Sequence, residues 1–245
     1  RNWTSQGNVL RHNYIHDLGG GDSTHVNTMG VYLDDCDSGD TIEGNVFLRA
    51  GRAIMIGGGR DNRVLNNLVI DCPIGMHLDS RGMTWKQWNS PTDTSWQLER
   101  KAKEMNYQEP PWSERYPTLA TIMDDSPREP LHNEFKRNIF VNCAKQVWNF
   151  DANVKKVLEK LVVRDNVAVS TVGAAKGIAM APDIDGFKNV VGSDQKPIVI
   201  GFATEDGTEL TQIKDARIRA AVPTFQPIPF DTIGLTKDSY RRVIP

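Results

Sequence analysis

The chain has 245 residues, 39% of them apolar and 24% charged, with a formal net charge of −2 at pH 7. This composition is typical of a globular protein with one large domain or two smaller ones, and the charge excludes the basic surface of most nucleic-acid-binding proteins. No apolar run approaches the roughly 18 residues needed to cross a bilayer, so we expect no membrane span.

The beginning of the chain looks like the interior of a longer protein. It opens on Arg1 without a Met and enters a repeat at Val9–Ile15. We therefore expect further N-terminal coils and conclude nothing about a targeting segment. The three cysteines, Cys36, Cys72 and Cys143, do not make a disulfide framework, and we expect buried thiols.

A short phrase centred on Asn occurs five times, first as LRHNYI at Leu10–Ile15 and then as IEGNVF at Ile42–Phe47. The central residues are Asn13, Asn45, Asn67, Asn138 and Asn166. Each has an apolar residue three positions before it and another two positions after it, which predicts two short strands joined by a bend. Stacked Asn side chains form amide ladders, so we interpret these residues as structural.

A second phrase occurs three times, as GVYLDD at Gly30–Asp35, AIMIGG at Ala53–Gly58 and GMHLDS at Gly75–Ser80. The first inward residues of the three copies, Val31, Ile54 and Met76, are 23 and 22 residues apart. A fixed period of this size indicates a solenoid, in which each repeat stacks on the last. The sequence therefore predicts an all-β fold, a right-handed parallel β-helix with about 22 residues per coil.

Successive side chains of a strand point to opposite faces, so the second phrase has an inward and an outward set. The outward set is Tyr32 and Asp34, Met55 and Gly57, and His77 and Asp79. A fourth coil, WNFD at Trp148–Asp151, places Asn149 beside His77 and Asp151 beside Asp79. The outward column Asp34, Gly57, Asp79, Asp151 should then rise by about 4.8 Å per strand.

An insertion at residues 81–132 leaves the repeat directly after Asp79. Insertions of this length are usually functional or disordered, and this one holds the aromatic residues Trp85, Trp88, Trp96, Trp112, Tyr107 and Tyr116. The spacing of Leu98, Ala102 and Met105 predicts a helix, and Pro117 can open a second one. We expect an ordered flap. A smaller Gly-rich excursion with His25 precedes Gly30.

After Asn166 the repeat weakens. Strand-like pieces are expected at residues 178–180, 198–202 and 213–218. The tail at residues 223–235 has three Pro and cannot be a ladder strand, so it should lie outside the coils or close their end. We divide the chain into coils with their insertion (1–170) and last irregular coils with a capping tail (171–245), all in one domain.

Three features of the second phrase point to the same chemistry. The carboxylates share one column, the triglycine Gly57–Gly59 removes side chains between Asp34 and Asp79 and should open a slot, and the Trp-rich insertion leaves beside Asp79. Paired carboxylates and aromatic faces are what a glycosidase needs.

The spacing leaves the catalytic pair open. Asp34 and Asp79 are two strands apart, about 9.6 Å, which suits inversion, and Asp79 and Asp151 are one strand apart, about 4.8 Å, which suits retention. Asp35 can replace Asp34. The candidates for substrate binding are His77, Arg81, Tyr32, Trp85, Trp88, Trp112, Asn149 and His25. The sequence has no zinc-site spacing, phosphate loop or Ser-His-Asp arrangement, and we expect no metal or cofactor for hydrolysis.

The phrases GVYLDD and NRVLNNLVIDC, the flap phrase PPWSERYPTL and the closing FQPIPFDTIGL resemble bacterial secreted right-handed β-helix proteins of the pectin-lyase-like superfamily. Within it the chain is similar to glycoside hydrolase family 141, whose activities include fucosidase and xylanase. The resemblance implies a polysaccharide or oligosaccharide as partner and a secreted, periplasmic or cell-surface location. Similarity to polygalacturonases is limited to Asp34-Asp35, because their other signatures are missing.

Three functions follow. The first is hydrolysis of a polysaccharide, or of a glycoside branch on one, by Asp34 and Asp79, with Asp35, Asp151 and His77 in support. The second is a calcium-dependent lyase, in which Asp34, Asp79 and Asp151 hold calcium and Arg81 is the base. The third is a carbohydrate-binding or structural solenoid without catalysis, in which the acids would be dispersed and the Trp side chains of the flap would pack inward.

Overall fold

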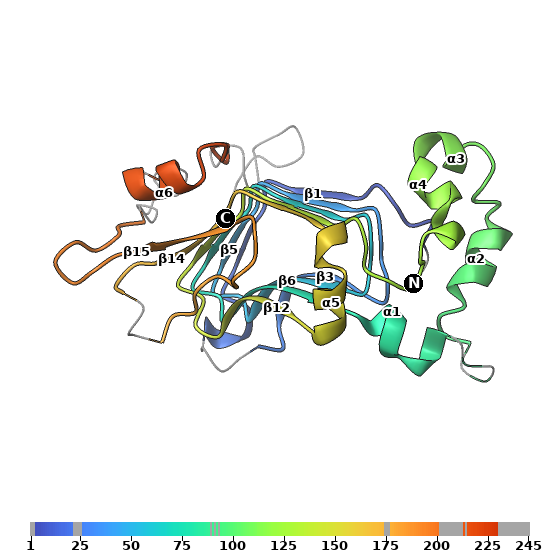
Figure 1. Cartoon of the computed structure of the whole chain (residues 1–245), viewed down its shortest axis with the longest axis horizontal. Helices are drawn as coiled ribbons and strands as arrows, with labels where there is room; N and C mark the ends of the chain where they lie inside the picture. Colours follow the sequence, from blue (N-terminus) through green and yellow to red (C-terminus); the bar gives the residue numbers. More distant parts are fainter. Residues whose placement is uncertain are drawn as a thin grey trace, which may run out of the picture.

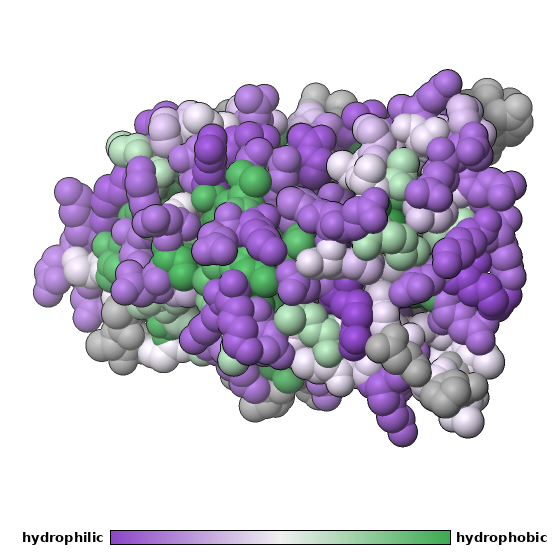
Figure 2. Space-filling view, turned by 45° about the vertical axis from the view of Figure 1, so that its right-hand side comes forward, coloured by the Kyte–Doolittle hydropathy of each residue, from purple (hydrophilic) through white to green (hydrophobic). Residues whose placement is uncertain are grey.

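The computed structural model describes residues 3–21, 26–88, 90, 92, 94–173, 177–200, 213 and 215–229. Its body is a stack of coils whose strands form parallel sheets (Figure 1). The insertion lies at one side of the coils, near the N-terminus, and α6 (Ala216–Ala221) lies at the opposite side. Among the described residues, no helix is long and apolar enough to span a membrane. Figure 2 shows a mostly hydrophilic surface on the face that it displays.

The described strands make three sheets, and every neighbouring pair is parallel. The first sheet has the order β1 (Val9–Arg11), β4 (Thr41–Glu43), β7 (Arg63–Leu65), β10 (Glu134–Lys136), β13 (Val162–Arg164). The second has the order β15 (Phe187–Val191), β14 (Asn166–Ser170), β11 (Ile139–Val141), β8 (Leu68–Ile70), β5 (Val46–Leu48), β2 (Tyr14–His16). The third has the order β12 (Gln146–Phe150), β9 (Ile74–Asp79), β6 (Arg52–Gly57), β3 (Met29–Leu33). This arrangement is a parallel β-helix, as the repeats predict.

The predicted register holds across the third sheet. Val31 pairs with Ile54, Ile54 with Met76, and Met76 with Trp148. The last pairing crosses the insertion, so the coil resumes on the far side of residues 81–132 in the alignment expected from the repeats. Inward side chains of these coils are buried, and Phe135 packs on Trp148 with ring centroids 4.8 Å apart. Cys72 and Cys143 are buried free thiols, as expected.

The five repeated Asn residues form the predicted ladder. The side-chain amide of Asn45 donates to Oδ1 of Asn67 at 3.0 Å, and that of Asn67 donates to Oδ1 of Asn138 at 3.0 Å. The backbone N–H groups of Asn45 and Asn67 donate to the same acceptors. A second ladder, which the repeated phrases do not predict, joins Asn8, Asp40, Asn62 and Asn133. Its signal is hidden because one rung is Asp rather than Asn.

The insertion folds into short helices around a small core of its own. Its helices are α1 (Arg81–Thr84), η2 (Lys86–Trp88), α2 (Leu98–Glu104), α3 (Trp112–Arg115), α4 (Pro117–Ala120) and η3 (Ile122–Asp124). The predicted helices around Leu98 and from Pro117 are both present. Trp96, Tyr107 and Leu119 of the insertion are buried together with Trp3, so the flap is tied to the start of the chain.

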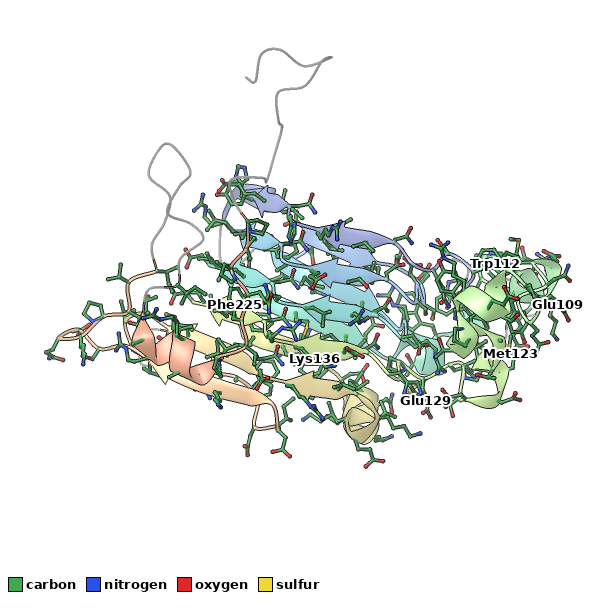
Figure 3. All side chains as sticks on the ribbon, turned by 90° about the horizontal axis from the view of Figure 1, so that it is seen from above. Glu109, Trp112, Met123, Glu129, Lys136 and Phe225 are labelled. Atoms are coloured by element: carbon green, nitrogen blue, oxygen red, sulfur yellow. The ribbon has the colours of Figure 1, made fainter. Side chains whose placement is uncertain are left out.

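The strands expected after Asn166 are wrong where the structure describes them. Residues 178–180 and 198–200 are irregular, and residues 216–221 form α6, because Asp215 caps a helix that buries Ile218 and Ala221 on one face. Residues 201, 202 and 214 lie outside the described part. The tail runs along the outside of the coils near Phe225 (Figure 3), where Gln226 exchanges hydrogen bonds of 2.9 and 2.7 Å with Asn66. Residues 230–235 of the tail lie outside the described part.

Candidate functional site

Three of the four predicted carboxylates meet at one arginine, Arg81, the first residue of α1. Its side chain is 3% exposed, and its Nε and Nη2 donate to Asp79 at 3.0 and 2.7 Å. Nη1 donates to Asp34 at 2.7 Å and to Asp35 at 3.2 Å. Asp79 ends β9 and Asp34 follows β3, two strands away in the sheet. The fold therefore collects three carboxylates from separate coils around one guanidinium.

The glycines between the acids make room for Arg81 and do not leave an open slot. A Cβ on Gly57 would lie 2.5 Å from Cζ of Arg81, and one on Gly58 would lie 2.7 Å from its Cγ. The expectation of a slot at Gly57–Gly59 is therefore wrong, because the side chain that follows Asp79 turns back over β6 and fills the space. The sequence shows an Arg two residues after Asp79, but it does not show the direction in which that side chain points.

Two exposed aromatic rings border the guanidinium. Tyr32 accepts a hydrogen bond of 2.8 Å from Nη1 of Arg81, and Cζ of Arg81 lies 5.5 Å from the ring of Tyr32 and 4.6 Å from the ring of Trp85. Tyr32 is 40% exposed and Trp85 is 43% exposed. Aromatic faces next to charged donors and acceptors are a suitable surface for a sugar ring, which presents both C–H and O–H groups.

The three acids differ in access to solvent. The Asp34 side chain is 45% exposed, that of Asp79 is 18% exposed and that of Asp35 is 5% exposed. Asp35 and the following Cys36 have φ of 44° and 65°, so the chain turns sharply after β3 and directs two consecutive carboxylates toward Arg81. Asp34 is thus the acid most accessible to a ligand, and Asp35 is part of the buried support.

Asp151 has a different role from the one expected. It caps α5 (Ala152–Lys156), where its Oδ1 accepts from the N–H groups of Asn153 and Val154 at 2.9 and 3.0 Å. Its Oδ2 accepts from the N–H and Oγ of Ser80 at 3.1 and 2.7 Å. Partial burial raises the pKa of Asp151, but these hydrogen bonds outweigh it and the pKa lies below its ordinary value. Both oxygens are occupied, so the arrangement favours Asp34 with Asp79 over Asp79 with Asp151.

His77 lies in the next outward row, in register with Met55 on one side and Asn149 on the other. Its Nδ1 is in close contact with Nη1 of Arg52, which can only donate, so Nδ1 accepts and the ring proton is on Nε2. Burial and then the charge of Arg52 lower the pKa of His77 to about 4. The imidazole is therefore neutral at pH 7. The repeat pattern does not single out Arg52, whose only signal is its position at the start of β6.

The other Trp residues of the insertion pack in or against its small core: Trp96 is buried, and Trp88 and Trp112 are half-buried. Trp88 lies 5.2 Å from Trp3 and 6.4 Å from Trp96 between ring centroids, and Trp112 stacks on Tyr116 at 6.1 Å. Figure 3 places Trp112 in the outer part of the insertion, with Glu109 and Met123. The expected sugar contacts of Trp88 and Trp112 are therefore not supported, whereas Trp85 borders the acids. His25 lies outside the described residues.

The profile of one family, described as "Periplasmic copper-binding protein (NosD)", matches residues 2–104, less than half of the chain. No curated protein and no solved structure matches the chain. The family match agrees with the β-helix, and its periplasmic description agrees with the expected secreted, periplasmic or cell-surface location. The narrower resemblance to glycoside hydrolase family 141 is not confirmed and stays a prediction.

The described residues do not fit a copper site. Copper prefers sulfur and imidazole ligands, but in this part of the chain no group of three or more His, Cys, Asp or Glu side chains is placed to hold a metal ion. Cys36 is 2% exposed, and burial raises the pKa of its thiol to about 12. The acids proposed for calcium are held by Arg81 and by the cap of α5 instead.

Proposed function

We propose that this protein is a secreted or periplasmic β-helix hydrolase that cleaves a glycosidic bond of a polysaccharide or of a branch on one. Asp34 and Asp79 are the two carboxylates that act on the bond. The observation that carries the proposal is their convergence, from separate coils, on Arg81 beside the exposed rings of Tyr32 and Trp85.

The contacts of the acids suggest their roles. Asp79 accepts hydrogen bonds from two nitrogens of Arg81, which fix the position of its carboxylate, and we assign it the activation of water. Asp34 is half-exposed and protonates the leaving oxygen. Water adds to the anomeric carbon, the bond from that carbon to the leaving oxygen breaks, Asp79 takes a proton from the water, and Asp34 supplies one to the oxygen. Asp34 follows β3 and Asp79 ends β9, two strands apart in the third sheet, and this wider spacing suits inversion better than retention.

A second candidate is carbohydrate binding without catalysis. It is favoured by the position of Arg81, which fills the gap between Asp34 and Asp79, and by the inward packing of Trp88 and Trp96. In this case the acids orient Arg81, and the sugar lies on Tyr32 and Trp85. The convergence of the acids favours the hydrolase, because a purely structural solenoid would leave them dispersed.

The test measures the release of reducing sugar from a panel of plant and algal polysaccharides. We expect Asp34→Asn and Asp79→Asn each to lower the rate by roughly 100-fold or more, because each removes an acid or base from the reaction. Asp165→Asn, an equivalent change at a distant corner of the coils, should leave the rate unchanged.

The alternatives give different results. Wild-type protein that binds a glycan without cleaving it, and loses binding in Tyr32→Ala and Trp85→Ala, would establish the binding function. An unsaturated product that absorbs in the ultraviolet and disappears with chelator would identify a lyase. Full hydrolytic activity in both Asn variants would refute the assignment of the carboxylates.

A further inference from the structure

A second arginine, Arg52, lies on the same face of the third sheet as the proposed site. It is the first residue of β6 and is half-buried. Its Nη1 contacts Nδ1 of His77 and lies 3.5 Å from the sulfur of Met55. Both partners are neutral, since the pKa of His77 is lowered to about 4.

Among the described residues, the side-chain contacts of Arg52 are with Met55 and His77 and not with a carboxylate, and its Nε is buried without a hydrogen-bond partner. Arg81, by contrast, is surrounded by three carboxylates, and the buried Arg60 pairs with Asp61 at 2.9 Å. Burial lowers the pKa of Arg52, and the more distant Asp79 and Tyr32 offset this only in part. A partly desolvated cation without a counter-anion costs free energy, which a bound anion would recover.

The position of Arg52 relative to the acids matches the size of a sugar unit. The guanidinium of Arg52 contacts Met55 and His77, which belong to the outward row Tyr32, Met55, His77. This row lies two residues before the row Asp34, Gly57, Asp79 along the strands, a step of roughly 6.6 Å. A substituent of the sugar held at the acids, or of its neighbour, can therefore reach Arg52. The three acids repel an anion placed among them, so a charged substituent would point toward Arg52 and would fix the orientation of the glycan.

We propose that Arg52 binds an anionic substituent, a carboxylate or a sulfate ester, on the glycan that the Arg81 cluster holds. The guanidinium offers planar paired donors that match either group, and Nε2–H of His77 is a further donor beside it. The substrate class is thus an acidic polysaccharide. This inference rests on the proposed function only in taking a glycan as the ligand, because it concerns binding and not cleavage.

The test is an equilibrium binding assay on acidic polysaccharide fragments, each paired with its carboxyl-reduced or desulfated form. We expect the wild type to prefer at least one acidic member by about tenfold or more over its neutral form, and the preference to weaken with salt. Arg52→Gln should abolish the preference without changing binding to the neutral form. Loss of affinity on carboxyl reduction identifies a uronate, and loss on desulfation identifies a sulfate ester.

Two controls separate a binding role from a folding role. Arg63→Gln, at an exposed arginine of another sheet, should keep the preference. Arg52→Lys keeps the charge without the planar donors and should retain part of the preference for the acidic form. Thermal unfolding should show that each variant is folded. Equal binding of acidic and neutral forms by the wild type, or an acidic preference that survives Arg52→Gln, would overturn the inference. Neither result depends on hydrolysis, which Asp34→Asn and Asp79→Asn test separately.

Discussion

Arg81 combines a structural and a chemical role in one side chain. It is almost fully buried, is hydrogen-bonded to three carboxylates and a phenol, and lies against the backbone of Gly57. Burial alone would lower its pKa, but Asp79 and Tyr32 raise it above its ordinary value, so the guanidinium stays charged. A buried charge of this kind is strongly held only while its partners are present.

Replacing Arg81 therefore has a large effect. We expect Arg81→Met to lower the free energy of unfolding by about 3 kcal/mol, because the side chains of Asp35 and Asp79 lose the cation that pairs with them in a partly buried site. Urea unfolding measures this as a lower midpoint at an unchanged slope. Arg63→Met, at an exposed arginine, should cost less than about 1 kcal/mol. Equal losses in the two variants would show that the cluster contributes nothing to stability.

Among the elements, the Asn ladder links successive coils at their buried corner. Asn67 accepts from both the backbone and the side chain of Asn45 and donates to Asn138 and to the carbonyl of Ile42 at 3.0 Å. It is 0% exposed, whereas Asn13 at the other end of the ladder is exposed. Asn67 and Asn13 occupy the same position in their coils, but water can replace the lost hydrogen bonds only at the exposed Asn13.

This difference predicts unequal costs for the same substitution. Asn67→Ala leaves several buried groups without partners and should destabilise the protein by about 3 kcal/mol, while Asn13→Ala should cost less than about 1 kcal/mol. Thermal or urea unfolding of the two variants is the measurement. A ladder that served only to set the backbone angles would give similar losses in both.

The elements also show what the sequence can predict. Period and apolar spacing predict the coils, their register across the insertion and the Asn ladder, because these depend on residues that recur. The contacts of Arg81 and Arg52 cannot be predicted from the repeat, because each is a long side chain whose direction is fixed by tertiary contacts. Residues 213–218 have apolar residues at both the helical and the strand spacing, so the sequence predicts a strand there, and only the burial of Ile218 with Ala221 distinguishes the helix α6.

For the whole molecule, the neutral His77 couples stability to pH. Its folded pKa is about 4, below the ordinary value of 6.5, so between these values the unfolded chain binds the proton and the folded chain does not. Stability from this residue is therefore fully present above about pH 6.5 and is lost as the pH falls toward 4. The loss should be on the order of 2 kcal/mol after allowance for the partial exposure of the ring.

His77→Gln tests this coupling. Unfolding free energies measured from pH 7 to pH 4 should fall less steeply in the variant than in the wild type, and the two curves should differ most at the acidic end. His132→Gln, at an exposed histidine hydrogen-bonded to Asp125, is the control. Its curve of unfolding free energy against pH should differ little from that of the wild type. Parallel curves for wild type and His77→Gln would show that the imidazole is not held neutral.

The space above Gly57 couples the side chains that positions 57 and 81 can carry together. A methyl group there would collide with the guanidinium of Arg81, so Gly57 cannot gain a side chain while Arg81 keeps its place. Relatives that carry a side chain at the equivalent of Gly57 should have lost the long cation after the outward Asp, and with it the means to hold both acids. Replacement of both Gly57 and Arg81 in a relative would therefore indicate that this face of the β-helix has a different function there.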